Sequence, residues 1–281
     1  MKKLSSNGVI FAIFIIFTVI CFAFKGKGPD ISIQILFSVA SFLFGISCGF
    51  SISNRYTRLN RIKDYLKEND AIMHFLYRSS PVFGSKVQKE IQKLIDEHLI
   101  EQIDYYLIDF HKSGKTFLDL FNYLVNLKSS NKEQETLYDK YIDLLDDMTK
   151  NRKMVEVLVR SRIQKFEWAS LGSLLVLIIF CIIFLNTGEF FITVASILLA
   201  TSTTILFMML LDLDTLHWKE NSWVWGQLED LFHELDLLPY YPEKVIQDGR
   251  TVLTKGTEIR MVTYPNPYPN IEGKNVRVKK I

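Results

Sequence analysis

The chain has 281 residues, of which 48% are apolar and 23% are charged, and its net charge is +2. This near balance argues against a nucleic-acid binder, because such proteins carry a strongly basic face. The three cysteines imply no disulfide framework. The charged residues avoid four long apolar runs, which hold no Asp, Glu, Lys or Arg and which comprise residues 8–24, 31–53, 168–186 and 190–211.

About twenty residues of α-helix cross the roughly 30 Å hydrocarbon layer of a bilayer. The runs therefore predict an all-α integral membrane protein with four transmembrane helices in two hairpins, embedded in a lipid bilayer. The first run follows Lys2 and Lys3, as a secretory signal does. It is longer than a signal core of about 7 to 15 residues and lacks a small-residue cleavage site, so we expect a retained helix.

Basic residues flank the long middle segment on both sides, whereas the loop at 186–189 between the last two runs holds none. By the positive-inside rule, the N-terminus, the middle segment and the C-terminal tail are cytoplasmic. We expect a multi-pass protein of the plasma (inner) membrane. The expected domains are a first hairpin (1–54), a cytoplasmic helical domain (55–166), a second hairpin (167–213), an amphipathic helix (214–240) and a tail with short strands (241–281).

Within the helical domain, apolar residues at helical spacing from Val87 to Phe110 predict one amphipathic helix. A second helix is expected from Ser130, where Ser130 and Glu133 have the spacing of a capping box. No Gly or Pro lies between Ser130 and Trp168, so this helix is expected to continue into the third transmembrane run.

The segment after the fourth run carries Trp218, Trp223 and Trp225, followed by an apolar stripe. Tryptophans at a membrane exit are typical of interfacial anchors, but the same stripe would also pack on the cytoplasmic domain, and both interpretations stay open. Further on, Asp248 and Gly249 predict a hairpin turn and residues 257–264 predict a strand.

No motif predicts catalysis, a metal or a cofactor. Residues 113–116 read SGKT, but Asp109 stands where a phosphate-binding loop needs glycine, and helix rather than strand precedes it. The histidines lack the ligand spacing of a metal site, and His98 beside an apolar stripe is expected to be a satisfied core residue. We therefore expect a protein that is not an enzyme.

Small or polar residues recur at three and four spacing along one face of the second run, and they are Gln34, Ser38, Ser41, Gly45, Cys48 and Gly49. Such a face meets either protein or water. Gly45 and Gly49 have the spacing of a close helix-packing motif. The alternative is that the face lines an ion path in an oligomer.

Charged residues follow the ends of the second and fourth runs, and they are Arg55, Arg58, Arg61, Asp212 and Asp214. A carboxylate is costly within the bilayer, so Asp212 and Asp214 belong at its cytoplasmic boundary. They are expected to meet Arg55 or Arg58 there, either as plain interfacial charges or as ion pairs at a mouth or gate.

The segment FSISNRYTRLNRIK (50–63) places Phe50, Tyr56 and Arg58 at offsets that resemble the bestrophin family. The order of two spans, a helical insert, two spans and a tail is similar too, and the region ending in LLDLD (210–214) resembles the bacterial bestrophin-like group. The resemblance implies a homo-oligomer, with a pentamer as the expected form, whose second span lines a central ion path. Leu59 stands where that motif has Trp, and calcium sensing is not carried over.

The favoured hypothesis is therefore a bestrophin-like homo-oligomeric channel that conducts ions, with anions favoured by the arginines after the second span. The alternative is a non-conducting membrane scaffold or signalling protein that recruits partners through its cytoplasmic helices and tail.

Overall fold

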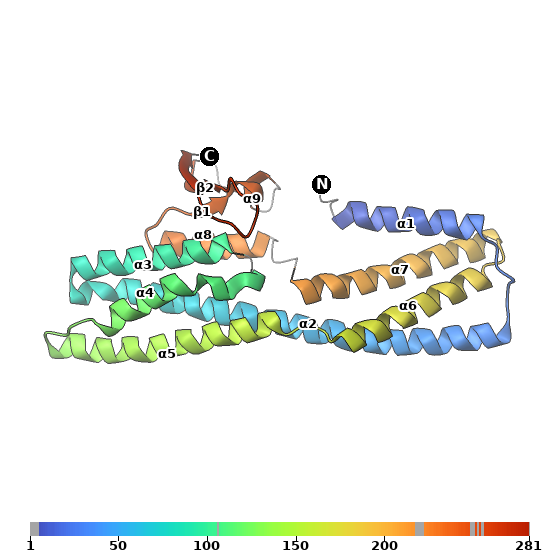
Figure 1. Ribbon diagram of the computed structural model, residues 1–281, viewed down its shortest axis with the longest axis horizontal. Coiled ribbons are helices and arrows are strands. Elements are labelled where there is room, and N and C mark those ends of the chain that lie inside the picture. The colour runs from blue at the N-terminus through green and yellow to red at the C-terminus, as the bar shows by residue number, and fades with distance from the viewer. Residues whose placement is uncertain are drawn as a thin grey trace. The chain divides into compact units, whose positions relative to one another are not determined.

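The computed structural model describes residues 6–105, 107–216, 222–247, 251, 253 and 256–280. It is 77% helical. The chain forms two compact units, one made of Met1–Leu59 with Arg162–Thr215 and the other of Asn60–Ser161 with Leu216–Ile281 (Figure 1).

The first unit is built from apolar helices, and these are α1 (Ser6–Ala23), the first part of α2 (Ile31–Ser79), α6 (Lys165–Leu185) and α7 (Phe190–Thr215). α7 packs against both α1 and α6 (Figure 1). Ala40, Phe44 and Cys48 recur every four residues on α2, so they lie on one helical face and enter the core of this unit. Large apolar side chains cover much of its outside as well, which is typical of helices surrounded by lipid.

By length and composition, three helices of the described residues can cross a membrane, namely α2, α6 and α7. The apolar part of α1, Gly8–Ala23, is shorter. The four apolar runs thus all form helices, while a count of four membrane spans stays a prediction.

The second unit is a helical bundle with a small sheet. Its helical elements after α2 are η1 (Ser80–Phe83), α3 (Ser85–Asp104), η2 (Leu107–Ser113), α4 (Gly114–Val125), α5 (Lys132–Arg160), α8 (Ser222–Glu234) and α9 (Glu243–Gln247). Residues without exposed surface share one core, and they include Leu76 on α2, Ile95 on α3, Leu120 on α4 and Leu235 directly after α8.

Two predicted helix boundaries in this unit are wrong by a few residues. α3 ends at Asp104, and Phe110 lies in η2 instead of continuing the helix. The cap of α5 is Asn131 rather than Ser130, because the Asn131 side chain accepts a hydrogen bond from the Gln134 N–H at 2.9 Å. The Gln134 side chain in turn accepts from the Ser130 N–H at 2.7 Å, so a capping arrangement exists one residue later than predicted.

The expected continuous helix from Ser130 into the third run is also wrong. α5 ends at Arg160 and α6 starts at Lys165, with Ser161 in an extended conformation. The Ile163 N–H donates to Asp214 Oδ1 at 2.9 Å instead of to a carbonyl of its own helix. A tertiary contact therefore interrupts a stretch that contains no Gly or Pro.

A three-stranded sheet follows α8, with β1 (Tyr240–Pro242) parallel to β2 (Glu258–Thr263) and β2 antiparallel to β3 (Asn275–Lys280). The predicted strand at 257–264 is confirmed as β2. The predicted turn at Asp248 and Gly249 lies outside the described residues.

Candidate functional site

The predicted small and polar face of α2 is largely exposed. Gln34, Ser38, Gly45 and Gly49 are exposed and Ser41 is half-buried. Cys48 differs from the other five, because it is only 2% exposed and packs in the core of the first unit with Phe44. The exposed polar face therefore runs through Gln34, Ser38, Ser41, Gly45 and Gly49, which we name the α2 polar face.

Within the described chain, no helix packs closely on this face at its glycines. A Cβ atom built on Gly45 or Gly49 would meet no atom within 4 Å. Small residues that serve close helix packing would show the opposite, since they exist to let another backbone approach. The face is therefore open to something other than the described part of this chain.

The residues beside the α2 polar face are bulky. Phe42 and Phe50 are 66% and 69% exposed, respectively, and Ile46 is 44% exposed. The hydroxyl of Ser38 donates to the carbonyl of Gln34 at 2.9 Å, which satisfies that hydroxyl without a partner from another helix. The α2 surface thus has a narrow small-residue strip with large apolar groups alongside.

The structure brings together three of the five charged residues predicted at the ends of the spans. Asp214 Oδ1 lies 3.3 Å from Arg55 Nη1 and 3.8 Å from Arg58 Nη1. Arg58 Nη1 also donates to the Asp214 backbone carbonyl at 3.0 Å. Arg58 and Asp214 are 5% and 4% exposed, respectively, so this ion pair is buried. Two guanidinium groups therefore contact one carboxylate.

The other two charged residues form no ion pair within the described part of the chain. Asp212 is exposed on α7, and Arg61 is exposed on α2 within the second unit. Asp214 rather than Asp212 is therefore the carboxylate that meets Arg55 and Arg58. The sequence did not predict a second polar contact near the start of α6. In this contact the Ser51 hydroxyl donates to Glu167 Oε1 at 2.5 Å.

Asn186 joins the two hairpins of the first unit. This role was also not predicted from the sequence. Its side-chain amide donates to the Cys21 carbonyl at 2.7 Å, and its side-chain oxygen accepts from the Thr193 hydroxyl at 3.0 Å. The Asn186 carbonyl accepts from the Gly26 N–H at 2.7 Å. Asn186 has no exposed surface. Its position at the end of an apolar run, where an amide is costly without partners, was the available signal.

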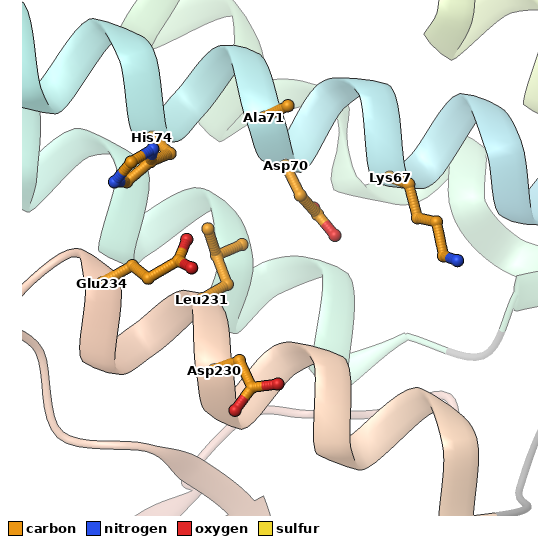
Figure 2. Close-up of a pocket in the computed structure, with 7 residues that line it drawn as sticks. All are labelled: Lys67, Asp70, Ala71, His74, Asp230, Leu231 and Glu234. Carbon is orange, nitrogen blue, oxygen red and sulfur yellow. The ribbon is translucent and has the colours of Figure 1, made fainter.

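The second unit holds a cleft of about 330 Å³ between α2 and α8. Figure 2 shows Asp70 and His74 on α2 across from Glu234 on α8, and Lys67 and Asp230 line the same cleft. Burial, followed by the negative charge of Glu234, raises the pKa of Asp70 to about 7. Among the residues that the structure describes, no three His, Cys, Asp or Glu side chains could together hold a metal ion.

The SGKT segment and His98 form one internal network. The Thr116 hydroxyl donates to Glu101 at 2.6 Å, and the Thr116 N–H at the start of α4 points to the same carboxylate. His98 is 2% exposed, and its two ring nitrogens contact Thr116 and Gln102. Burial, followed by the nearby charge of Arg152, lowers the pKa of His98 to about 3. The prediction that His98 is a satisfied core residue is confirmed.

A buried carboxylate holds the sheet on the helices of the second unit. Asp104 Oδ1 accepts from the hydroxyls of Tyr240 at 2.9 Å and Tyr264 at 2.7 Å, and Lys274 pairs with Oδ2. Desolvation and the charge of Asp104 raise the pKa of both tyrosines, so their hydroxyls stay protonated as donors. Arg260 adds a bidentate pair with Asp96, with both distances at 2.6 Å.

The side chains of the three predicted tryptophan anchors are not among those that the structure describes. Trp218 lies outside the described residues, and the side chains of Trp223 and Trp225 within α8 do as well. Interfacial anchoring by these residues stays a prediction.

A family model of the bestrophin-like domain matches residues 9–216, which include both hairpins and the intervening helices. The chain belongs to the bestrophin-like family. This agrees with the resemblance of the 50–63 segment, and the α2 polar face and the Arg55, Arg58 and Asp214 cluster all lie within the matched region. No curated protein sequence matches the bestrophin-like chain.

Solved structures share its fold. A crystal structure of a bacterial bestrophin homologue from Klebsiella pneumoniae with a point mutation has a TM-score of 0.58 and 11% identity, and the match covers 73% of this chain and 89% of that chain. A crystal structure of a membrane protein, also a mutant, has a TM-score of 0.58 and 11% identity and covers 75% and 90%, respectively. At this identity, the likeness shows the fold alone.

Proposed function

We propose that this bestrophin-like chain is one subunit of a homo-oligomeric ion channel in which the α2 polar face lines the conduction path. Bestrophin homologues are membrane channels, which supports the general class. The observation that carries the specific assignment is the open space over Gly45 and Gly49 beside exposed Gln34 and Ser38. Small and polar groups exposed in the middle of an apolar helix are poorly suited to lipid and well suited to water.

The proposal includes the topology and the membrane. α1, α2, α6 and α7 each cross a bacterial inner membrane, and the N-terminus, the second unit and the C-terminus are cytoplasmic. The basic residues on both sides of the middle segment support this orientation. Five subunits are the expected number. The proposed role needs no metal or cofactor and no catalytic group.

The proposed permeant ions are anions. Arg55 and Arg58 bring two guanidinium groups to the end of the apolar part of α2, and Arg61 adds an exposed positive charge further along the helix. A positive field attracts anions and repels cations. Arg61 is the better residue to test, because Arg55 and Arg58 are engaged by Asp214. Arg61→Glu should shift the reversal potential in a chloride gradient toward cation permeability. An unchanged reversal potential would show that Arg61 does not contribute to ion selectivity.

Flux through liposomes tests the conduction path itself. Gly45→Leu places a large side chain in open space, so the subunit should fold and assemble while ion flux falls to the level of empty liposomes. Gly172→Leu on α6 is the matched control, because a Cβ atom there also meets nothing within 4 Å. Equal flux in the two variants would refute the assignment of the α2 polar face.

The alternative of a non-conducting scaffold gives a different result in the same assay. Wild-type oligomers of full size that carry no ion under any salt gradient or voltage would favour the scaffold. In that case the second unit, with its exposed strand β3, is the surface to probe for partners.

A further inference from the structure

The second unit carries two exposed surfaces of opposite charge. The first, named the basic edge, consists of Arg277, Lys279 and Lys280 on β3. The second, named the acidic ridge, consists of Glu135, Asp139 and Asp143 on α5. All six residues are exposed.

The basic edge belongs to a strand that is paired on one side only. The sheet order is β1-β2-β3, so the outer side of β3 has no neighbouring strand among the described residues. All residues of β3 are exposed, including Val278 at 63%. Within the part of the chain that the structure describes, its three cations form no ion pair with a carboxylate. Charged residues on an edge strand also prevent unspecific strand pairing. A partner is therefore expected to bind the basic edge through its charge rather than through backbone hydrogen bonds.

The acidic ridge concentrates like charges on one helical face. Glu135, Asp139 and Asp143 follow one another at four-residue spacing, where side chains are neighbours and like charges repel. Elsewhere α5 neutralises its acids, since Lys150 contacts both Asp146 and Asp147. Lys132 and Lys140 precede Glu135 and Asp143 by three residues, but among the described residues neither forms an ion pair with the acidic ridge. A cationic surface from outside would therefore relieve the repulsion further.

The spacings of the two surfaces agree. Four residues of helix rise about 6 Å, which separates Asp139 from Asp143. Two residues of strand rise about 6.6 to 6.8 Å, which separates Arg277 from Lys279 on the same face of β3. Two cations can thus meet two carboxylates at once.

The two surfaces cannot meet within one chain. Figure 1 shows the sheet and α5 at opposite sides of the second unit, with α3, α4 and α8 between them. Complementary patches on opposite sides of one subunit produce head-to-tail contacts, and such contacts close into a ring when the rotation allows it.

We propose that the basic edge of one copy binds the acidic ridge of the next copy around the oligomer. The inference rests on the homo-oligomer of the proposed function, but not on ion conduction. The partner is a second copy of this chain rather than another acidic protein, because the complementary surface is already present on every copy.

Charge reversal in the full chain, purified in detergent, tests the contact. Arg277→Glu with Lys279→Glu should raise the protein concentration needed for half-assembly by about tenfold, because like charges then face each other at every interface. Asp139→Lys with Asp143→Lys should do the same. All four substitutions together restore opposite charges and should return assembly to near the wild-type concentration. Native mass spectrometry at low salt reports the oligomer directly.

Lys86→Glu with Lys89→Glu is the matched control, because both lysines are exposed on α3 and the net charge change equals that of the β3 variant. This control should assemble as wild type does. The proposed contact would be overturned, and the oligomer left intact, if the double charge-reversal variants assemble as wild type does. The same holds if the quadruple variant assembles as weakly as either double variant. A monomeric wild type would overturn both this contact and the proposed oligomeric channel.

Discussion

Removal of the Asp214 carboxylate should destabilise the first unit strongly. In Asp214→Ala, the buried Arg58 loses the Asp214 carboxylate, and the Ile163 N–H loses its acceptor. Breaking a buried ion pair from one side costs about 3 to 5 kcal/mol. Arg55 is partly exposed and can turn toward solvent, so the low end of that range applies.

A loss of about 3 kcal/mol corresponds to a drop in Tm of roughly 6 to 12 °C for a chain of this size, at about 2 to 4 °C for each kcal/mol. Thermal unfolding in detergent, followed by tryptophan fluorescence, measures it. Asp212→Ala is the matched control, because that carboxylate is exposed only two residues away and should change stability by about 0.5 kcal/mol at most.

A compensated variant separates the lost pair from other damage. Arg58→Met with Asp214→Leu removes both buried charges, and an apolar replacement of a buried pair is often nearly neutral. Its Tm should lie above that of Asp214→Ala. A Tm of Asp214→Ala equal to that of Asp212→Ala would refute the view that this cluster stabilises the fold.

Asn186→Ala should cost about 1 to 3 kcal/mol, since the Cys21 carbonyl loses its donor; an unchanged Tm would show that the linkage between hairpins is dispensable. Asp104→Asn should weaken the bond to Lys274 and expose the sheet to limited proteolysis, whereas wild-type cleavage rates would contradict that role. Asp70 has a raised pKa, so the folded chain holds a proton that the unfolded chain releases between about pH 4 and pH 7. Wild-type stability should therefore fall as pH rises through this window, and Asp70→Asn should flatten the profile; parallel profiles in the two proteins would disprove a proton on Asp70.

The helices of the first unit could be predicted well from the sequence, because long apolar runs have few alternatives to membrane-type helices. The boundaries that failed depend on tertiary contacts. Nothing in the residues around Ile163 indicates a break, since the break depends on Asp214, about fifty residues away in the chain, accepting its N–H. The prediction of the α5 N-cap was wrong for a local reason. Ser130 and Asn131 are both favourable N-cap residues, and only the backbone geometry determines which of them caps the helix.

The candidate site was predictable in composition but not in detail. Helical spacing identified the α2 polar face, yet it placed Cys48 among residues that line it, whereas Cys48 is buried in the core of the first unit. Only the positions of neighbouring helices decide which edge of a stripe is buried. Likewise, Asp212 and Asp214 are equivalent by sequence, and the structure alone selects Asp214.

The linkage at Asn186 has a consequence for biosynthesis. The residues it connects, Cys21 and Asn186, are 165 positions apart, and a Cβ atom on Gly26 would lie 2.1 Å from the Phe184 carbonyl oxygen. These loops fit only when both are in place. A ribosome must therefore translate most of the chain before the contact between these two loops can form.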